Sequence, residues 1–195
     1  YDATILGTPE NLKSPAPDKI RTKPLVLNIF PGLKKPDVFY YDEGLHCMFA
    51  YQETKAPLVF VIAGTGANDR SAKVIAMMME LYKAGFHVIT LPSPSHPNFI
   101  ISASRSHVPG DLAEEAVDLY RVMEKAWDSV RRRVEVSEFY LSGYSLGGTH
   151  AAFVAKIDEE RKTFNFRKVL LVNPAVNLYN SILKIEGLLD RISGG

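Results

Sequence analysis

The sequence predicts an α/β fold, in which a mostly parallel β-sheet has helices on both faces and is preceded by an antiparallel β-hairpin. From residue 58 onward, short apolar segments alternate with longer segments of helical periodicity, the pattern of strands joined by helical crossovers. Residues 58–63 are apolar throughout, as in strands buried on both faces of a sheet. Residues 25–51 instead contain β-rich runs separated by turn residues, which is typical of antiparallel strands.

The first part of the chain is predicted to lie outside the parallel sheet. Residues 1–24 contain four prolines among mostly polar neighbours and are expected to form an irregular arm. Three β-rich runs follow at 25–30, 38–41 and 47–51, and the last two, joined through residues 42–44, predict the hairpin. The core of the predicted α/β fold is expected to span residues 25–175. Residues 176–195 carry apolar side chains at helical spacing and are expected to begin a cap or lid segment.

Four strands are expected in one parallel sheet, at 58–63, 88–91, 139–142 and 169–172. The helix after the first of them should begin after Ser71 as N-cap and end before Gly85. A longer helix should follow Asp111, with Glu114 placed for a capping box. A helix of small residues is expected around 151–155. The intervening loop, 92–110, is long for a compact domain, so it is expected to be functional or mobile.

Composition excludes several functions. The chain of 195 residues has 23 Lys plus Arg against 22 Asp plus Glu, with the basic residues scattered, which argues against a nucleic-acid surface. Its tight basic run, residues 131–133, follows a predicted helix, where cations are favoured by the helix dipole. No apolar run is long enough for a membrane span. The single cysteine, the histidine spacing and the glycine loops match no metal or nucleotide motif, so no metal and no cofactor are predicted.

The strongest chemical signal is the sequence Gly-Tyr-Ser-Leu-Gly at residues 143–147. It matches G-x-S-x-G, in which a strand turns sharply into a helix with the serine at the apex. Glycine is required at the flanking positions because side chains there would collide with the neighbouring strand and helix. An aromatic and aliphatic run precedes this motif and a helix of small residues follows it, which is the context such a turn needs.

With this motif, residues 25–175 resemble the α/β-hydrolase superfamily. The resemblance implies that Ser145 is the nucleophile and that the backbone NH of Leu146 is one oxyanion donor. The second donor in that family comes from the loop after an earlier strand. Here that loop contains Gly64 and Gly66, with Thr65 as the expected donor and Ala63 where the family often has histidine.

Several residues are expected to line a substrate pocket beside the serine, namely Gly64, Gly66, Tyr144 and His96. His96 is included because it follows the strand at 88–91, on the edge where ligands approach an α/β sheet. The alternative is that His96 is an exposed loop residue outside the site, and the same alternative applies to His107. His46 and His87 open predicted strands and are expected to be structural.

The histidine and carboxylate that would activate the serine follow it in the chain order of this family. The sole histidine after Ser145 is His150, inside the next helix, from which it is not expected to reach the serine. The late acids, Asp158 among them, are expected on solvated faces. The acid and base are therefore expected beyond residue 195.

We expect a serine hydrolase acting on a small-molecule ester or related acyl bond, and the alternative is a catalytically incomplete binding or scaffolding module of the same fold.

Overall fold

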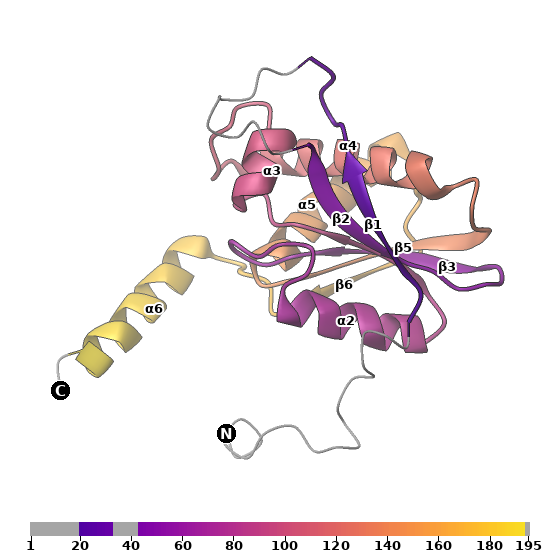
Figure 1. The fold of residues 1–195 in the computed structure, drawn as a ribbon. Coiled ribbons are helices and arrows are strands. Elements are labelled where there is room, and N and C mark those ends of the chain that lie inside the picture. The colour runs from indigo at the N-terminus through magenta and orange to yellow at the C-terminus, as the bar shows by residue number, and fades with distance from the viewer. Residues whose placement is uncertain (1–19, 33–42, 194–195) are drawn as a thin grey trace.

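The structure, a computed structural model, describes residues 20–32 and 43–193 and contains one six-stranded sheet with helices on both faces (Figure 1). The strands are β1 Thr22–Leu27, β2 Leu45–Ala50, β3 Ala56–Ile62, β4 His87–Leu91, β5 Val136–Tyr144 and β6 Lys168–Val172. The helices are α2 Ala72–Lys83, α3 Pro97–Ser102, α4 Leu112–Val130, α5 Leu146–Arg161 and α6 Leu178–Ser193. None of the helices in the described ranges is both long and apolar enough to cross a bilayer.

The sheet has the order β1-β2-β4-β3-β5-β6. The strands β4, β3, β5 and β6 are mutually parallel, as predicted for the four apolar runs. The antiparallel part consists of β2, which pairs with β4 on one side and with β1 on the other. The predicted fold class, a mostly parallel sheet with an antiparallel hairpin, is therefore confirmed.

The hairpin differs from the prediction in its outer strand. Its members are β1 and β2, paired from Thr22 opposite Ala50 to Leu27 opposite Leu45. Residues 38–41, the partner expected from the sequence, lie outside the described residues. The strand also begins at Thr22, so Pro24 belongs to it and not to an irregular arm. Because β1 is an edge strand, the missing NH of a proline is tolerated there.

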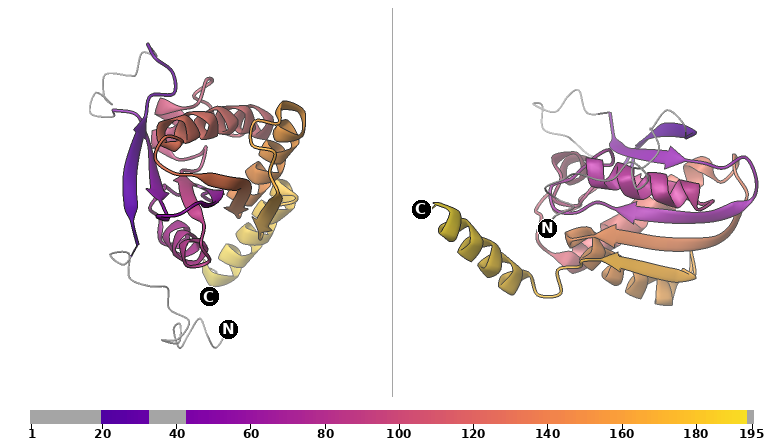
Figure 2. Two further views of the ribbon diagram at one scale, coloured as in Figure 1. Left: turned by 90° about the vertical axis from the view of Figure 1, so that its right-hand side faces the viewer. Right: turned by 90° about the horizontal axis from the view of Figure 1, so that it is seen from below.

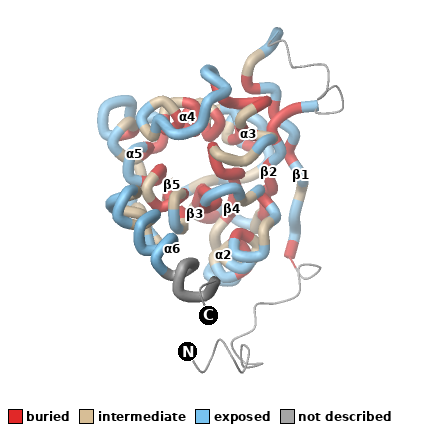
Figure 3. The backbone as a smooth tube through the Cα atoms, turned by 90° about the vertical axis from the view of Figure 1, so that its left-hand side faces the viewer, coloured by how far each residue is buried: buried red, intermediate tan, exposed pale blue. Residues whose placement is uncertain are grey.

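The two faces of the sheet are covered by different helices. Along β3, Leu58, Phe60 and Ile62 belong to the larger apolar cluster, which includes buried residues of α3, α4 and α5. Val59 and Val61 belong to the other cluster, with Met78 and Met79 of α2. Because successive side chains of a strand point to opposite faces, this alternation fixes the three-layer arrangement. Figure 3 shows the buried central strands between these layers.

The helix ends follow the predicted caps. The Asp111 carboxylate accepts hydrogen bonds from the NH groups of Ala113 and Glu114, at 3.0 Å each. Ser71 occupies the N-cap position of α2, although its side chain makes no capping hydrogen bond there, and Gly85 follows the helix with φ +90°. The predicted loop 92–110 contains the short helix α3, which begins with Pro97 and is capped by the His96 side chain.

The far edge of the sheet carries exposed apolar groups. β6 is the edge strand of the described sheet, and its Leu170 and Leu171 side chains are 58% and 38% exposed. Beyond it α6 extends away from the body of the sheet (Figure 2). Tyr179 and Ile182 of this helix are also exposed. Whether residues 176–195 form a cap or lid stays a prediction.

Candidate active site

Ser145 lies at a sharp turn between a strand and a helix. β5 ends at Tyr144 and α5 begins at Leu146, so the serine is the single residue between them. Its backbone has φ 53° and ψ −127°, a conformation that non-glycine residues adopt rarely and that often marks functional sites. Its NH donates to the Val172 carbonyl, 2.9 Å away on β6. The exposed side chain is therefore held at the carboxyl edge of the parallel strands, as the sequence predicts.

The glycines around this turn leave no room for side chains. A Cβ on Gly143 would collide with the carbonyl oxygen of Gly147, and a Cβ on Gly147 would collide with those of Ile62 and Ala63. The backbone of α5 thus packs directly against the ends of β3 and β5. This close contact explains why the motif requires glycine at both positions.

The loop after β3 lies against the same turn. A Cβ on Gly64 would be 2.6 Å from Tyr144 Cε2 and 3.2 Å from Ser145 Cβ, so glycine permits this contact. Thr65 follows and is exposed. Leu146 is the first residue of α5, where a backbone NH has no acceptor within its helix. The structure therefore brings the loop with the expected second donor beside Ser145.

A cavity of about 500 Å³ opens beside the serine. Its lining contains no acidic residue and comes from the turn after β5, the end of β6 and the exposed face of α2: Lys73, Ala76, Met77, Tyr144, Ser145, Val172 and Asn173. The Lys73 ammonium lies 5.8 Å from the centroid of the Tyr144 ring, within the range of a cation–π contact. The cavity therefore combines one cation with apolar walls. Of the four expected pocket residues, Tyr144 lines this cavity, and Gly64 lies against the Tyr144 ring.

The two other expected pocket residues, Gly66 and His96, take part in other contacts. The Gly66 NH donates to Ser95 Oγ at 2.9 Å. His96 Nδ1 accepts a hydrogen bond from the NH of Asn98 at 3.2 Å and so caps α3. Neither residue lines the cavity at Ser145. His107 is also not among the lining residues, and its Nδ1 is 2.7 Å from the carbonyl oxygen of Ile100.

His150 is turned away from the cavity. Its imidazole is fully buried, and its Nε2 is 2.7 Å from Glu115 Oε2 on α4. Glu115 also accepts a hydrogen bond from the NH of Gly110 through Oε1. His150 therefore joins α5 to α4, in line with the expectation that it does not reach the serine. Sequence reasoning missed Glu115 as its partner, although a glutamate beside the apolar stripe of a helix is a signal for such a buried pair.

Asp158 corrects an expectation about the late acids. It was expected on a solvated face but is 3% exposed. Its carboxylate accepts hydrogen bonds from the Tyr120 hydroxyl and from two backbone NH groups, and these bonds make its burial possible.

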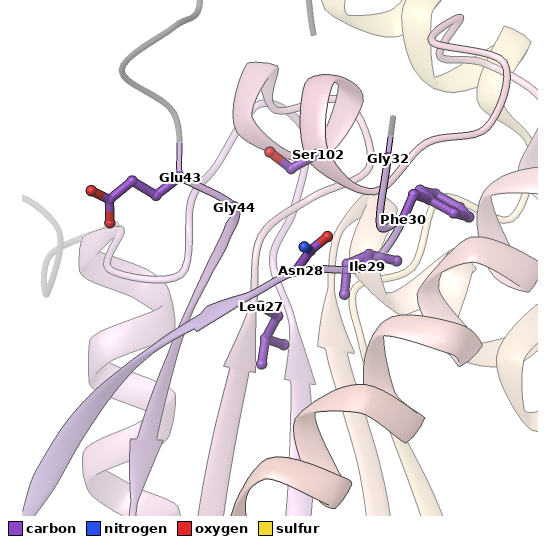
Figure 4. A pocket seen from close by; sticks show the side chains of 8 residues that line it. All are labelled: Leu27, Asn28, Ile29, Phe30, Gly32, Glu43, Gly44 and Ser102. Carbon is purple, nitrogen blue, oxygen red and sulfur yellow. The ribbon is translucent and has the colours of Figure 1, made fainter. Parts of the chain in front are cut away.

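A second cavity, of about 120 Å³, lies beside the antiparallel strands β1 and β2. It is bordered by the end of β1, by the start of β2 and by Ser102 of α3 (Figure 4). It shares no lining residue with the cavity at Ser145. Across the described ranges 20–32 and 43–193, no three histidine, cysteine or acidic side chains are grouped so as to hold a metal ion.

Comparison with solved structures finds a similar arrangement of sheet and helices in several esterases. An esterase from the archaeon Pyrobaculum calidifontis matches 85% of this chain with a TM-score of 0.54 at 18% identity. A structure from a study of two fungal esterases of Rhizomucor miehei matches 86% of it with a TM-score of 0.55 at 13% identity. The chain has the α/β-hydrolase fold.

This chain spans about half the length of those esterases, since the match covers 46% of the archaeal chain and 47% of the fungal one. No family model and no curated protein matches the sequence. The likeness to the esterases is thus one of α/β-hydrolase architecture.

Proposed function

We propose that this protein is a serine hydrolase that cleaves an ester or related acyl bond of a small molecule through an acyl-enzyme at Ser145. The observation that carries the proposal is the backbone of Ser145, which holds its hydroxyl at the carboxyl edge of the sheet, beside a cavity. The esterase neighbours support the same reaction class.

The reaction proceeds by nucleophilic catalysis. Ser145 Oγ attacks the acyl carbon while its proton passes to a base, and the resulting tetrahedral intermediate carries a negative charge on the former carbonyl oxygen. The NH groups of Leu146 and Thr65 stabilise this oxyanion, and each such donor lowers the barrier by about 3 kcal/mol. The alcohol leaves with a proton, and water then attacks the acyl-enzyme to release the acid and restore Ser145.

The base and its carboxylate are expected beyond residue 195, because they follow the serine in the chain order of α/β-hydrolases. In the described part of the chain no histidine lines the cavity at Ser145, and His150 is engaged by Glu115. This same observation favours the second candidate function, a binding or scaffolding module of this fold that lacks a complete triad.

Labelling by a fluorophosphonate together with hydrolysis of a short activated ester tests the proposal. The natural protein that contains these residues should show both reactions, and Ser145→Ala should abolish them. Ser129→Ala is the matched control, because Ser129 is exposed at the end of α4 and does not line the cavity at Ser145. The 195 residues alone should label weakly, since a triad without its base retains about 10³ to 10⁴ of rate over water.

Two results would change the proposal, the first its reaction and the second the location of its base. A natural protein that neither labels nor hydrolyses would favour the binding module. Strong labelling of the 195 residues at Ser145 would instead place the base within them.

A further inference from the structure

The loop after β4 holds the loop after β3 through a group of serine hydrogen bonds. The Gly66 NH donates to Ser95 Oγ at 2.9 Å, and the Ser93 NH donates to the Ala67 carbonyl at 2.9 Å. The two serine hydroxyl oxygens are 2.9 Å apart, and Ser93 Oγ also accepts from the Ser95 NH at 3.3 Å. Ser93 is fully buried, so these bonds anchor the exposed residues 65 and 66 to the body of the sheet.

These contacts fix the peptide groups on both sides of Thr65. On one side Gly64 is packed against Tyr144 and Ser145, where even a Cβ would not fit. On the other side Gly66 has φ +65°, a left-handed conformation, and its NH is directed to Ser95. Because the Gly66 NH already has an acceptor, it is not available to a substrate oxygen. The orientation of the Thr65 NH is therefore set by Gly64 and by Ser95.

We propose that Ser95 is a positioning residue that orients the Thr65 NH toward the oxyanion by holding the neighbouring Gly66 NH. This inference rests on the proposed function of Ser145 and Thr65. Ser95 does not touch the reacting atoms and acts through the loop. Ser93 supports it by fixing the Ser95 hydroxyl and by binding the backbone at Ala67.

The position of Ser95 predicts a specific kinetic change. An oxyanion contact is stronger in the transition state than in the bound ester, so misplacing its donor lowers kcat and leaves KM nearly constant. We expect Ser95→Ala in the natural protein to lower kcat by about tenfold or more, with KM within about twofold. Ser95→Thr, which keeps a hydroxyl, should recover most of the lost rate.

Amide hydrogen exchange of the 195-residue chain tests the loop without any activity. In Ser95→Ala the Gly66 NH loses its acceptor and should exchange at least about tenfold faster, and the Thr65 amide resonance should shift or broaden. The Ala63 NH, which donates to the Leu91 carbonyl on the neighbouring strand, is the internal control and should not change. The melting temperature of each variant shows that the fold is retained.

The outcomes separate this inference from the proposed function. Faster Gly66 exchange with a reduced kcat and a constant KM supports it. Unchanged Gly66 exchange, or faster exchange with an unchanged kcat, overturns it. If Ser145→Ala leaves ester hydrolysis intact, the proposed function fails and the positioning role fails with it, whereas the exchange result still reports whether Ser95 holds the loop.

Discussion

The Tyr120 hydroxyl donates a hydrogen bond to Asp158 Oδ1 over 2.6 Å, which joins the middle of α4 to the end of α5. The same carboxylate accepts from the NH groups of Phe164 at 3.0 Å and Phe166 at 3.1 Å, in the segment that leads into β6. Burial, and then this bond to Asp158, raise the pKa of Tyr120 to about 12. The helix that begins directly after Ser145 is therefore anchored at its far end by one buried acid.

Removing the Asp158 carboxylate should lower the stability of the fold. Asp158→Ala leaves a buried hydroxyl, the buried NH of Phe164 and the half-buried NH of Phe166 without their acceptor, so we expect a loss of about 3 kcal/mol in the free energy of unfolding. Tyr120→Phe, which leaves both backbone bonds in place, should cost about 1 kcal/mol. Urea denaturation of the two variants measures the difference. Equal losses would contradict a role of Asp158 in holding the backbone.

Gly147→Ala should destabilise the fold strongly. The new methyl group would overlap the carbonyl oxygens of Ile62, the last residue of β3, and of Ala63 directly after it, and this backbone cannot move aside as a side chain could. We expect a loss of about 3 kcal/mol, measured by thermal unfolding. Gly187→Ala is the matched control, since it also lies within a helix and a Cβ there has no neighbour within 4 Å. A melting temperature lowered equally in both variants would show that the contact at Gly147 is not responsible.

His87 should make the protein less stable in weak acid. Its ring is fully buried, with Nδ1 accepting from the Gln52 NH at 3.1 Å and Nε2 lying 3.2 Å from the Glu135 carbonyl oxygen. Burial lowers the pKa of His87 below its ordinary value of 6.5. Below this value the unfolded chain binds a proton that the folded chain does not, so the free energy of unfolding falls as the pH drops toward the folded pKa.

Urea denaturation at about pH 7.5 and about pH 5.5 measures this effect, with His87→Gln as the comparison. The variant lacks the titrating ring, so its stability should change less between the two conditions. A pH dependence identical in both proteins would assign the acid sensitivity to other groups.

Cys47 should be unreactive in the folded protein. Its side chain is 1% exposed, and burial, with a further contribution from the Asp69 carboxylate, raises the pKa of the thiol well above its ordinary value. Since the thiolate is the reactive form, Ellman's reagent should react at least about a hundredfold more slowly than with the unfolded chain. In denaturant one thiol per chain should react, because the sequence has a single cysteine. Rapid reaction in native buffer would show that β2 opens readily.

Much of the fold could be read from local patterns. The run at 58–63 is apolar because β3 lies between helices on both of its faces, and Asp111 marks the start of α4 because its carboxylate bonds the first NH groups. The start of β1 was missed because Pro24 is usually a strand breaker. It is tolerated here because β1 lies at an edge, which is a property of the assembled sheet.

The candidate site was predictable where it depends on a short motif. The glycines and Ser145 follow from the geometry of one tight turn, and the structure has that turn. The hydrogen bond between Gly66 and Ser95 spans 29 residues, and that between Tyr120 and Asp158 spans 38. Neither leaves a periodic signal in the sequence. From the sequence alone, Ser95 in a loop and Asp158 late in a helix are both expected to face solvent. Only the folded structure brings Gly66 and Tyr120 into contact with them.

The edge formed by β6 has a practical consequence for handling the 195 residues in solution. An edge strand with exposed leucines favours association between molecules. Light scattering should therefore rise with concentration and on adding salting-out ions such as sulfate, which strengthen apolar contacts. A lysine in place of Leu170, whose side chain is already more than half exposed, should keep concentrated samples clear without altering the buried layers.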